Sequence, residues 1–347
     1  MYIIDPRSMQ TGDIVLTRNN TKQSKIIQGL TESGFSHVLL HVGYGSYMHA
    51  DKNGTHSYNA QRLLLDSATD AIVLRLKDQS NIAPHQWSEI CNSTRKNVGV
   101  RYAYKKALQA GINSIITKVK FTNAEGSKLL YCSLLISEAY KCADVDLCPG
   151  VDLCTPGDIE NSSLLYTIPS PVRLATESEI QFAKDKKKDK ISHQTKATNF
   201  ILEKSRRSIS RKINTFDDLY QFALQKKGLD KKISKIIEDS GFLKMPELLL
   251  RDTPWRYEYN AFQQLKLNDP ERRLRVLDEL DLSHRQIRKY ESAVKNYQDQ
   301  YEKTNLICLK VQLNAFKKML ELSYKSSILF TNLLSEYNHK DVELDQS

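Results

Sequence analysis

Residues 34–50 read Gly34-Phe35-Ser36-His37-Val38-Leu39-Leu40-His41-Val42-Gly43-Tyr44-Gly45-Ser46-Tyr47-Met48-His49-Ala50. Two runs rich in apolar, β-branched and aromatic residues flank the glycines at 43 and 45. This pattern is typical of two antiparallel strands joined by a tight turn. We therefore expect strands over residues 37–42 and 46–50. Four of the eight histidines lie between His37 and His56, so this hairpin is also a candidate for chemistry.

The sequence around this hairpin mixes strand and helix signals. Eleven of the thirteen glycines precede residue 158. Apolar runs predict further strands over residues 13–17 and 71–76, and Pro84 opens a predicted helix that ends near residue 97. Two more helices are expected over residues 102–118 and 130–142, and later prolines such as Pro156 are expected in loops. Residues 1–172 are thus predicted to form an α+β domain with an antiparallel sheet.

The C-terminal half has a helical pattern. The last 106 residues contain no glycine, and apolar residues recur there at spacings of three and four. Ser283 and Gln286 resemble a capping box at the start of a long helix. We expect a basic helical region over residues 173–245 and an α-helical bundle or coiled-coil arm over residues 246–347. Self-association into a homo-oligomer through these C-terminal helices is a further expectation.

The composition is that of a soluble protein. The chain has 347 residues, with 40% hydrophobic and 27% charged residues and a mean hydropathy of −0.50. Its apolar runs are shorter than the roughly 20 residues of a membrane-spanning helix. The first ten residues lack the pattern of a secretory signal, which predicts a cytoplasmic protein but leaves signal-independent secretion open. Six cysteines in so long a chain do not suggest a disulfide scaffold, so a reducing compartment is expected.

Positive charge is concentrated in one stretch. Between Lys184 and Lys235 there are sixteen basic and six acidic residues, an excess equal to the net charge of +10 for the whole chain. Such an excess can attract an anionic surface or nucleic acid. A solvated helical face explains it equally well, because no groove-reading motif accompanies the lysines.

A single cysteine stands at the start of the predicted helix over residues 130–142. Unpaired backbone N–H groups and the helix dipole at such a position favour a thiolate. A nearby imidazole can take the thiol proton and later protonate a leaving group. Cys132 with His37 would therefore suffice for thiol-dependent acyl transfer or hydrolysis, with a third polar group orienting the imidazole.

The third residue depends on the strand register. A turn centred on Gly43 places His49 opposite His37, whereas a two-residue loop turns His49 to the other face unless a bulge intervenes. Asp51 and His56 are weaker candidates for this role. His41 shares the face of His37 but lies about 13 Å along the strand, so one cysteine cannot easily engage both.

Six short motifs occur in order along residues 8–170. They are Gly12-Asp13-Ile14-Val15-Leu16, Ser36-His37-Val38, His49 on the following strand, Gly99-Val100-Arg101-Tyr102, Tyr131-Cys132-Ser133-Leu134 and Thr155-Pro156-Gly157-Asp158. Together they resemble the circularly permuted branch of the NlpC-type papain-like cysteine peptidase superfamily, most closely the YiiX/YaeF-like group. In that branch the histidine precedes the cysteine. Residues 171–347 resemble no family that we can name.

The resemblance implies a papain-like fold and a set of roles. Cys132 would be the nucleophile, His37 the general base, and His49 the third polar residue, although some relatives carry an acidic residue in that place. The lecithin–retinol acyltransferase branch is similar in motif order and in the spacing of the two histidines. Its cysteine lies in an Asn-Cys-Glu-His-Phe-type motif, where this chain reads Tyr131-Cys132-Ser133-Leu134-Leu135, which counts against lipid acyl transfer.

Three functions remain open from the sequence. The first is a thiol hydrolase that cleaves a peptide-like or isopeptide-like amide through a thioester on Cys132. The second is an acyltransferase or lipid esterase that uses the same residues, and the third is a non-catalytic interaction protein. No cofactor is expected, since no nucleotide-binding glycine motif is present, and the mechanism needs no metal. The spacing of Cys142, Cys148 and Cys154 does not match a zinc motif.

Overall fold

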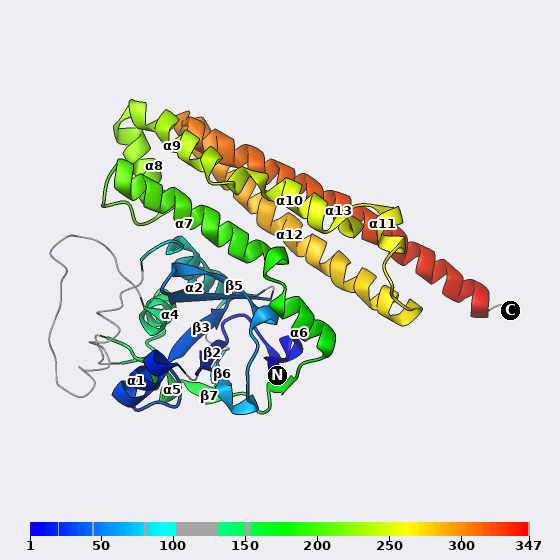
Figure 1. Cartoon of the computed structure of the whole chain (residues 1–347), viewed down its shortest axis with the longest axis horizontal. Coiled ribbons are helices and arrows are strands. Elements are labelled where there is room, and N and C mark those ends of the chain that lie inside the picture. Colours follow the sequence, from blue (N-terminus) through cyan, green and yellow to red (C-terminus); the bar gives the residue numbers. More distant parts are fainter. Residues whose placement is uncertain (20, 44, 80–81, 102–130, 150–152, 346–347) are drawn as a thin grey trace. The chain divides into compact units, whose positions relative to one another are not determined.

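The hairpin predicted from the sequence forms two inner strands of a six-stranded antiparallel sheet (Figure 1). The structure is a computed structural model, and it describes residues 1–19, 21–43, 45–79, 82–101, 131–149 and 153–345. The predicted helix over residues 102–118 lies outside the described residues. In spatial order the sheet contains β5 (Gly54–Asn59), β4 (Ser46–Asp51), β3 (His37–His41), β2 (Ile14–Thr17), β6 (Ala71–Leu76) and β7 (Leu165–Thr167).

The contacts divide the chain into two units, Met1–Asp218 and Leu219–Ser347, and each is described by itself. The first unit also contains a two-stranded sheet of β1 (Tyr2–Ile4) and β8 (Val172–Leu174). Its helices are α1 (Lys22–Thr31), α2 (Pro84–Lys96), α4 (Cys132–Lys141), α5 (Pro156–Glu160), α6 (Glu177–Lys184) and α7 (Lys190–Ser208). This confirms the expected mixture of helices with antiparallel strands.

The main sheet has an apolar core on each face. Even-numbered residues of β2 and β3, such as Leu16 and Val38, pack in one core with residues of α2 and α4. Odd-numbered residues, such as Val15 and Tyr47, pack in the other core with residues of β1 and β6. The alternation follows from the two-residue period of a strand. Because both faces are covered, the central strands are almost continuously apolar.

Helix α4 is held by a hydrogen bond to another segment at each of its ends. The Tyr140 hydroxyl, in its last turn, donates to the backbone carbonyl of Gly12 just before β2. The Ser133 hydroxyl, in its first turn, donates to the carbonyl of Cys154 at 2.8 Å. Both hydroxyls are completely buried, so these bonds satisfy groups that water cannot reach. The first residue of α4, Cys132, is thereby held in a defined position.

The register between β3 and β4 matches neither alternative considered from the sequence. Leu40 pairs with Met48 and His41 with Tyr47, which centres the turn one residue later than Gly43. Compared with a turn centred on Gly43, the centre moves by one residue, and the cross-strand partner of each residue moves by two. Because side chains alternate with a period of two, odd-numbered residues of both strands still share a face. His49 therefore remains on the face of His37, as a diagonal rather than a direct neighbour.

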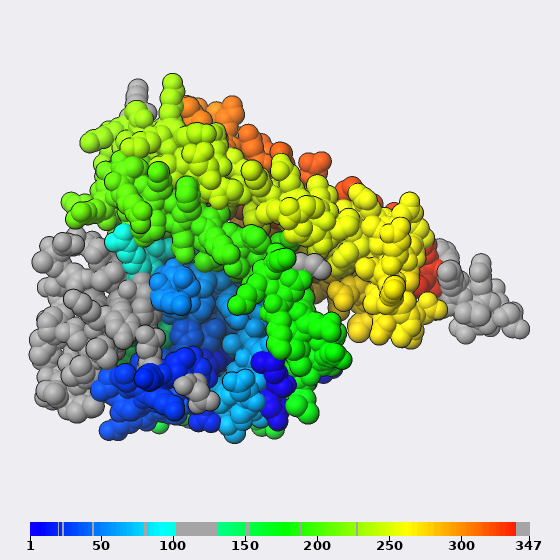
Figure 2. Space-filling model, viewed as in Figure 1, coloured from blue at the N-terminus to red at the C-terminus, as the bar shows by residue number. Residues whose placement is uncertain are grey.

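Strand β5 follows an Asn-Gly turn signal in the sequence, although we did not predict this strand. A turn over Lys52 and Asn53 joins it to β4, and Gly54 follows with a φ of +90°. An Asn-Gly pair between two strands is a strong hairpin signal. The strand pairs along its whole length with β4 and places His56 directly opposite His49. In the space-filling view, blue atoms of this part of the chain reach the surface next to the green atoms of α7 (Figure 2).

Two expectations about helix starts are wrong. Pro156 does not lie in a loop but opens α5, where Thr155 and Asp158 form a capping box. Ser283 does not cap a helix, because it lies within the uninterrupted helix α12 and its hydroxyl bonds to the Leu280 carbonyl. The actual capping box of α12 is Asn268 with Glu271. Both sequence patterns were ambiguous because Pro and Ser are common at helix starts and elsewhere.

The second unit is helical, as expected for the C-terminal region. Helix α8 (Phe216–Gln225) crosses the boundary between the units, and the unit continues with α9 (Lys227–Asp239), α10 (Met245–Asp252), α11 (Tyr259–Gln263), α12 (Asp269–Thr304) and α13 (Ile307–Asp345). The last two form a long antiparallel hairpin that turns at Asn305, which adopts a left-handed conformation. Phe262, Val276, Phe330 and Leu333 form a buried core in this unit. Among the described residues, no helix is long and apolar enough to cross a membrane.

Candidate functional site

Three histidines, which we call the histidine chain (His37, His49 and His56), are joined by hydrogen bonds across β3, β4 and β5. His37 Nε2 lies 2.8 Å from His49 Nδ1, and His49 Nε2 lies 3.1 Å from His56 Nε2. His56 Nδ1 is 3.1 Å from the backbone carbonyl oxygen of Gly54. His49 and His56 are buried, and His37 is partly buried. The structure thus brings together His37 and His49, and joins to them His56, which the sequence offered as a weaker candidate.

The Gly54 carbonyl fixes the direction of every hydrogen bond in the chain when the rings are neutral. A carbonyl oxygen can only accept, so His56 Nδ1 donates and His56 Nε2 must accept. His49 then donates from Nε2 and accepts at Nδ1, which requires His37 to donate from Nε2. The remaining nitrogen of the His37 ring, Nδ1, therefore carries a free lone pair and is the basic end of the chain.

Burial keeps the inner part of this chain neutral. Removal from water lowers the pKa of His37 to about 4, although the charge of Asp51 acts in the opposite direction. Burial also lowers the pKa of His49 well below its ordinary value, and the neighbouring histidines add to this effect. Both rings are therefore neutral near pH 7.

Cys132 lies at the first position of α4 and is 4% exposed. Its thiol lies near the backbone N–H of Val38, the residue that follows His37. Backbone N–H groups along β3 point alternately to its two neighbouring strands. The N–H of Val38 points towards β4, as does that of Val42, which donates to the Ser46 carbonyl. On β3, however, only Leu40 and His41 are paired with β4 in the strand register. The N–H of Val38 is therefore available to the Cys132 sulfur.

This interruption of the ladder matters for the site. By alternation, His37 and His49 belong to one face of the sheet, whereas Cys132 packs in the core on the other face. Where β3 and β4 separate, no paired backbone lies between the two faces. This gap borders Val38, whose backbone N–H lies near the Cys132 thiol. Within the described residues, no hydrogen bond joins Cys132 to His37.

The ionisation of Cys132 differs from the expectation based on its position at a helix start. Burial raises its pKa to about 11, although the backbone N–H groups of Val38, Ser133 and Cys132 itself act to lower it. Desolvation therefore outweighs the helix terminus. The resting state at neutral pH is a thiol beside neutral imidazoles, not a thiolate paired with an imidazolium.

The other candidates from the sequence have different surroundings. His41 Nδ1 donates to the Gln10 carbonyl at 2.8 Å, and its ring packs against Tyr47, so it is outside the histidine chain. Asp51 lies 3.7 Å from His56 Nδ1 and accepts the Asn53 backbone N–H at 2.7 Å in the β4–β5 turn. Asp51 therefore borders the far end of the chain rather than orienting His37 directly.

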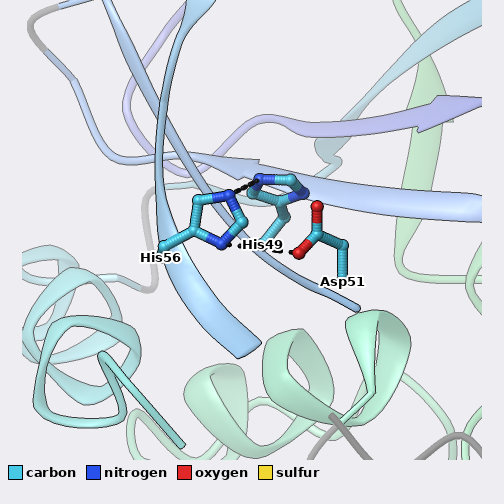
Figure 3. A group of neighbouring side chains, drawn as sticks. All are labelled: His49, Asp51 and His56. Carbon is cyan, nitrogen blue, oxygen red and sulfur yellow. Dashed lines mark hydrogen bonds and ion pairs between the residues drawn. The ribbon is translucent and has the colours of Figure 1, made fainter. Parts of the chain in front are cut away.

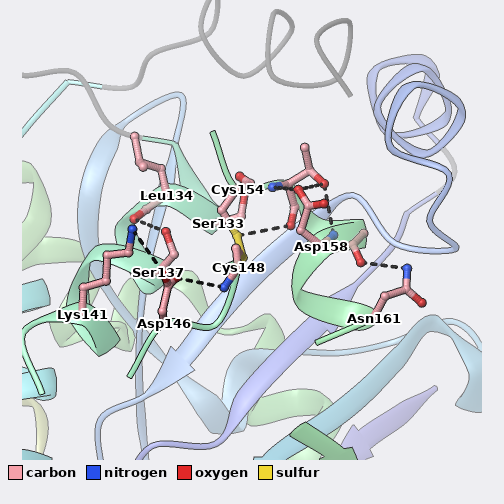
Figure 4. Close-up of a disulfide and its surroundings, with 11 residues drawn as sticks. Ser133, Leu134, Ser137, Lys141, Asp146, Cys148, Cys154, Asp158 and Asn161 are labelled. Carbon is pink, nitrogen blue, oxygen red and sulfur yellow. Dashed lines mark hydrogen bonds and ion pairs between the residues drawn. A yellow bond between two sulfur atoms is a disulfide. The ribbon is translucent and has the colours of Figure 1, made fainter. Parts of the chain in front are cut away.

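A disulfide between Cys148 and Cys154 lies beside the start of α4 (Figure 4). The carbonyl that accepts the Ser133 hydroxyl belongs to Cys154, so the disulfide-bonded segment contacts the residue next to Cys132. The sequence analysis did not predict this disulfide. The spacing of six residues gave no sign of this pairing.

Sequence reasoning missed two backbone groups of the site. The Gly54 carbonyl sets the direction of the histidine chain, and the Val38 N–H contacts the thiol. Backbone groups carry no residue-type signal, so only the Asn53-Gly54 turn pointed to this region.

Comparisons with known proteins add little to this description. No family model matches the chain, and no curated protein matches it. Among solved structures it is similar to the metalloprotein yiiX from Escherichia coli O157:H7, with 15% identity and a TM-score of 0.30 over 47% of this chain and 98% of that one. A weak neighbour thus comes from the YiiX/YaeF-like group suggested by the sequence. At this identity and TM-score, the likeness assigns no function to the chain.

Proposed function

We propose that this chain is a thiol hydrolase that cleaves an amide bond through a thioester on Cys132. The observation that carries the proposal is the fixed direction of the histidine chain, which leaves a lone pair on His37 Nδ1. The sulfur of Cys132 lies near the backbone of the next residue, Val38. A base and a nucleophile are thus supplied from neighbouring positions, as covalent acyl transfer requires.

The reaction begins from a neutral pair. As the sulfur attacks the substrate carbonyl, the thiol proton moves to His37 Nδ1, and the positive charge on the ring is stabilised by the acceptor nitrogen of His49. Backbone N–H groups at the start of α4 face the developing oxyanion. His37 then returns the proton to the leaving amine, and the C–N bond breaks. In the second half of the reaction His37 removes a proton from water as the water attacks the thioester. The C–S bond breaks, the carboxylic acid leaves, and His37 returns the proton to the sulfur, which restores the thiol.

Trapping of the acyl intermediate tests this proposal. Wild-type protein is incubated with cell extract, quenched in acid and analysed by intact mass and peptide mapping. We expect a mass increase on the peptide that contains Cys132, released by neutral hydroxylamine as a thioester should be. Cys132→Ala should abolish it, and Cys91→Ala, which removes a thiol buried in the same core, should retain it.

The same experiment decides between the functions left open by the sequence. An adduct with the mass of a peptide or amino-acyl group supports amide hydrolysis. A fatty-acyl adduct overturns it in favour of an acyltransferase or lipid esterase. Absence of any acyl adduct on Cys132 supports a non-catalytic interaction protein.

A further inference from the structure

The far end of the histidine chain lies next to a carboxylate. His49, Asp51 and His56 come from β4 and β5, and one donor atom from each lies within 4.8 Å of the others (Figure 3). The two imidazoles are buried, whereas the Asp51 side chain is 32% exposed. The group is therefore enclosed by protein on one side and open to solvent on the side of the carboxylate.

These three side chains form a donor set suited to a divalent transition-metal ion. Two imidazole nitrogens and one carboxylate oxygen, with water in the fourth position, are a common set of zinc ligands. In a tetrahedral site with Zn–N distances of 2.0–2.1 Å, the two nitrogens lie about 3.3 Å apart. His49 Nε2 and His56 Nε2 are 3.1 Å apart, which is close to this separation.

The surroundings supply the outer hydrogen bonds that such ligands need. The Gly54 carbonyl accepts from His56 Nδ1, and His37 Nε2 lies against His49 Nδ1. Bonds of this kind hold a metal-bound imidazole in the required tautomer. Asp51 accepts from the backbone N–H of Asn53 at 2.7 Å and from its amide at 3.3 Å. A carboxylate has about four acceptor positions, so capacity for a metal ion remains.

We propose that His49, Asp51 and His56 bind a divalent ion of the zinc class, and that binding switches off the base at His37. Coordination requires His49 Nε2 without a proton, so His49 must carry its proton on Nδ1 and donate it to His37 Nε2. His37 then carries its own proton on Nδ1. Three ring protons are present before binding and three after it, so the imidazoles release no net proton.

The inhibitory part of this inference rests on the proposed function, whereas the binding part does not. With a proton on Nδ1, His37 cannot accept one from the Cys132 thiol. The metal ion thus acts from the far end of the histidine chain, without touching the sulfur. The hydrogen bond between His37 and His49 has only one direction at a time. Metal binding at His49 and base activity at His37 therefore exclude each other.

Metal binding is measured first, by titrating Zn²⁺ into the metal-free full-length protein with calorimetric detection. We expect one site in the wild type and no comparable binding of Mg²⁺, which prefers oxygen ligands. Asp51→Asn should weaken binding about 10-fold or more, and His56→Phe should abolish it. His85→Ala, which removes an exposed histidine on α2, should leave binding unchanged. Undiminished affinity in both site variants, or its loss in Cys132→Ser, overturns the site.

The tautomer of His37 is measured on the wild type by NMR of ¹⁵N-labelled histidine. We expect the His37 proton to move from Nε2 to Nδ1 when Zn²⁺ binds, and no such change with His85. An unchanged tautomer in the zinc-bound protein overturns the switch.

Alkylation of Cys132 then separates the two proposals. Zinc should slow it at least 10-fold in the wild type and leave it unchanged in His56→Phe. If zinc binds and the tautomer changes but the alkylation rate does not, the role of His37 as base is wrong while the metal site stands. If zinc does not bind and alkylation still depends on His37, the metal inference alone fails.

Discussion

At the scale of the residue, the site is governed by desolvation. Cys132 occupies a position that would normally stabilise a thiolate, and yet burial raises its pKa to about 11. The same effect lowers the pKa of His37 to about 4. Both shifts favour neutral partners, so nucleophile activation must accompany attack instead of preceding it.

A first prediction concerns the reactivity of Cys132 in a Cys142→Ser background, which removes the exposed thiol. We expect the rate of alkylation by iodoacetamide to rise with pH through neutrality and to level off only near pH 11, because the thiolate that forms by direct ionisation at high pH reacts faster than the neutral thiol that His37 assists at pH 7. Mass mapping of the Cys132 peptide at successive pH values measures this. A plateau reached below pH 7 would show a preformed ion pair and contradict the neutral resting state.

A second prediction concerns the pH dependence of stability. The pKa of His37 is lowered on folding, so its contribution to stability is fully present above about pH 6.5 and is lost as pH falls towards 4. The loss is roughly 3 kcal/mol at most. Urea unfolding followed by Trp87 fluorescence in a Trp255→Phe variant, with a chelator present, measures it. His37→Phe should flatten the profile, and His85→Ala should not; equal profiles in all three would refute the assignment.

At the scale of the element, the start of helix α13 is stabilised by a residue far from it in the sequence. Helix α13 begins at Ile307, and its first N–H groups are capped from another helix. Asp230 of α9 accepts the backbone N–H of Ile307 at 2.7 Å and that of Cys308 at 2.9 Å. This buried carboxylate satisfies orphan donors at the helix start and interacts favourably with the helix dipole.

A third prediction follows for Asp230. Asp230→Ala should lower the unfolding free energy of the second unit by about 2 kcal/mol, because two buried N–H groups lose their acceptor. Asp230→Asn, which keeps one acceptor oxygen, should lose about half as much. Denaturant titration followed by Trp255 fluorescence in a Trp87→Phe background is the measurement. The prediction is wrong if alanine and asparagine are equally harmless.

At the scale of the whole molecule, part of the positive charge that stands out in the sequence has a structural role. Arg206 lies in the basic stretch between Lys184 and Lys235, and yet its side chain is buried. It donates to the carbonyls of Gly99, Ile213 and Asn214 and forms an ion pair with Glu203 at 2.8 Å. Binding of an anionic surface or nucleic acid by this stretch stays a prediction, as do homo-oligomerisation and the three-part division of the chain.

A fourth prediction concerns the two units, each of which has its own apolar core. Arg206→Met should destabilise the first unit by roughly 3 kcal/mol, because three carbonyls, two of them on buried residues, lose their donor. Thermal unfolding is followed by Trp87 fluorescence in a Trp255→Phe background and by Trp255 fluorescence in a Trp87→Phe background. We expect the Trp87 transition to shift and the Trp255 transition to stay in place. An equal shift of both would contradict this separation.

The sequence by itself determined the strands around His37 and His49, the helix that begins with Cys132 and the helical character of the C-terminal region. These features depend on local composition and periodicity, which a single chain displays directly. His37 and His49 lie on the two strands of one hairpin, so the sequence also predicted that they could lie close together. It did not predict the register on which this depends.

Only the tertiary structure decided the rest. The register of β3 with β4, the gap that exposes the Val38 N–H, and the Cys148–Cys154 disulfide all depend on contacts between segments far apart in the sequence. The direction of the histidine chain depends on one backbone carbonyl, that of Gly54, which no residue type encodes. The protonation of Cys132 likewise depends on burial, and burial is a property of the folded chain and not of the helix start alone.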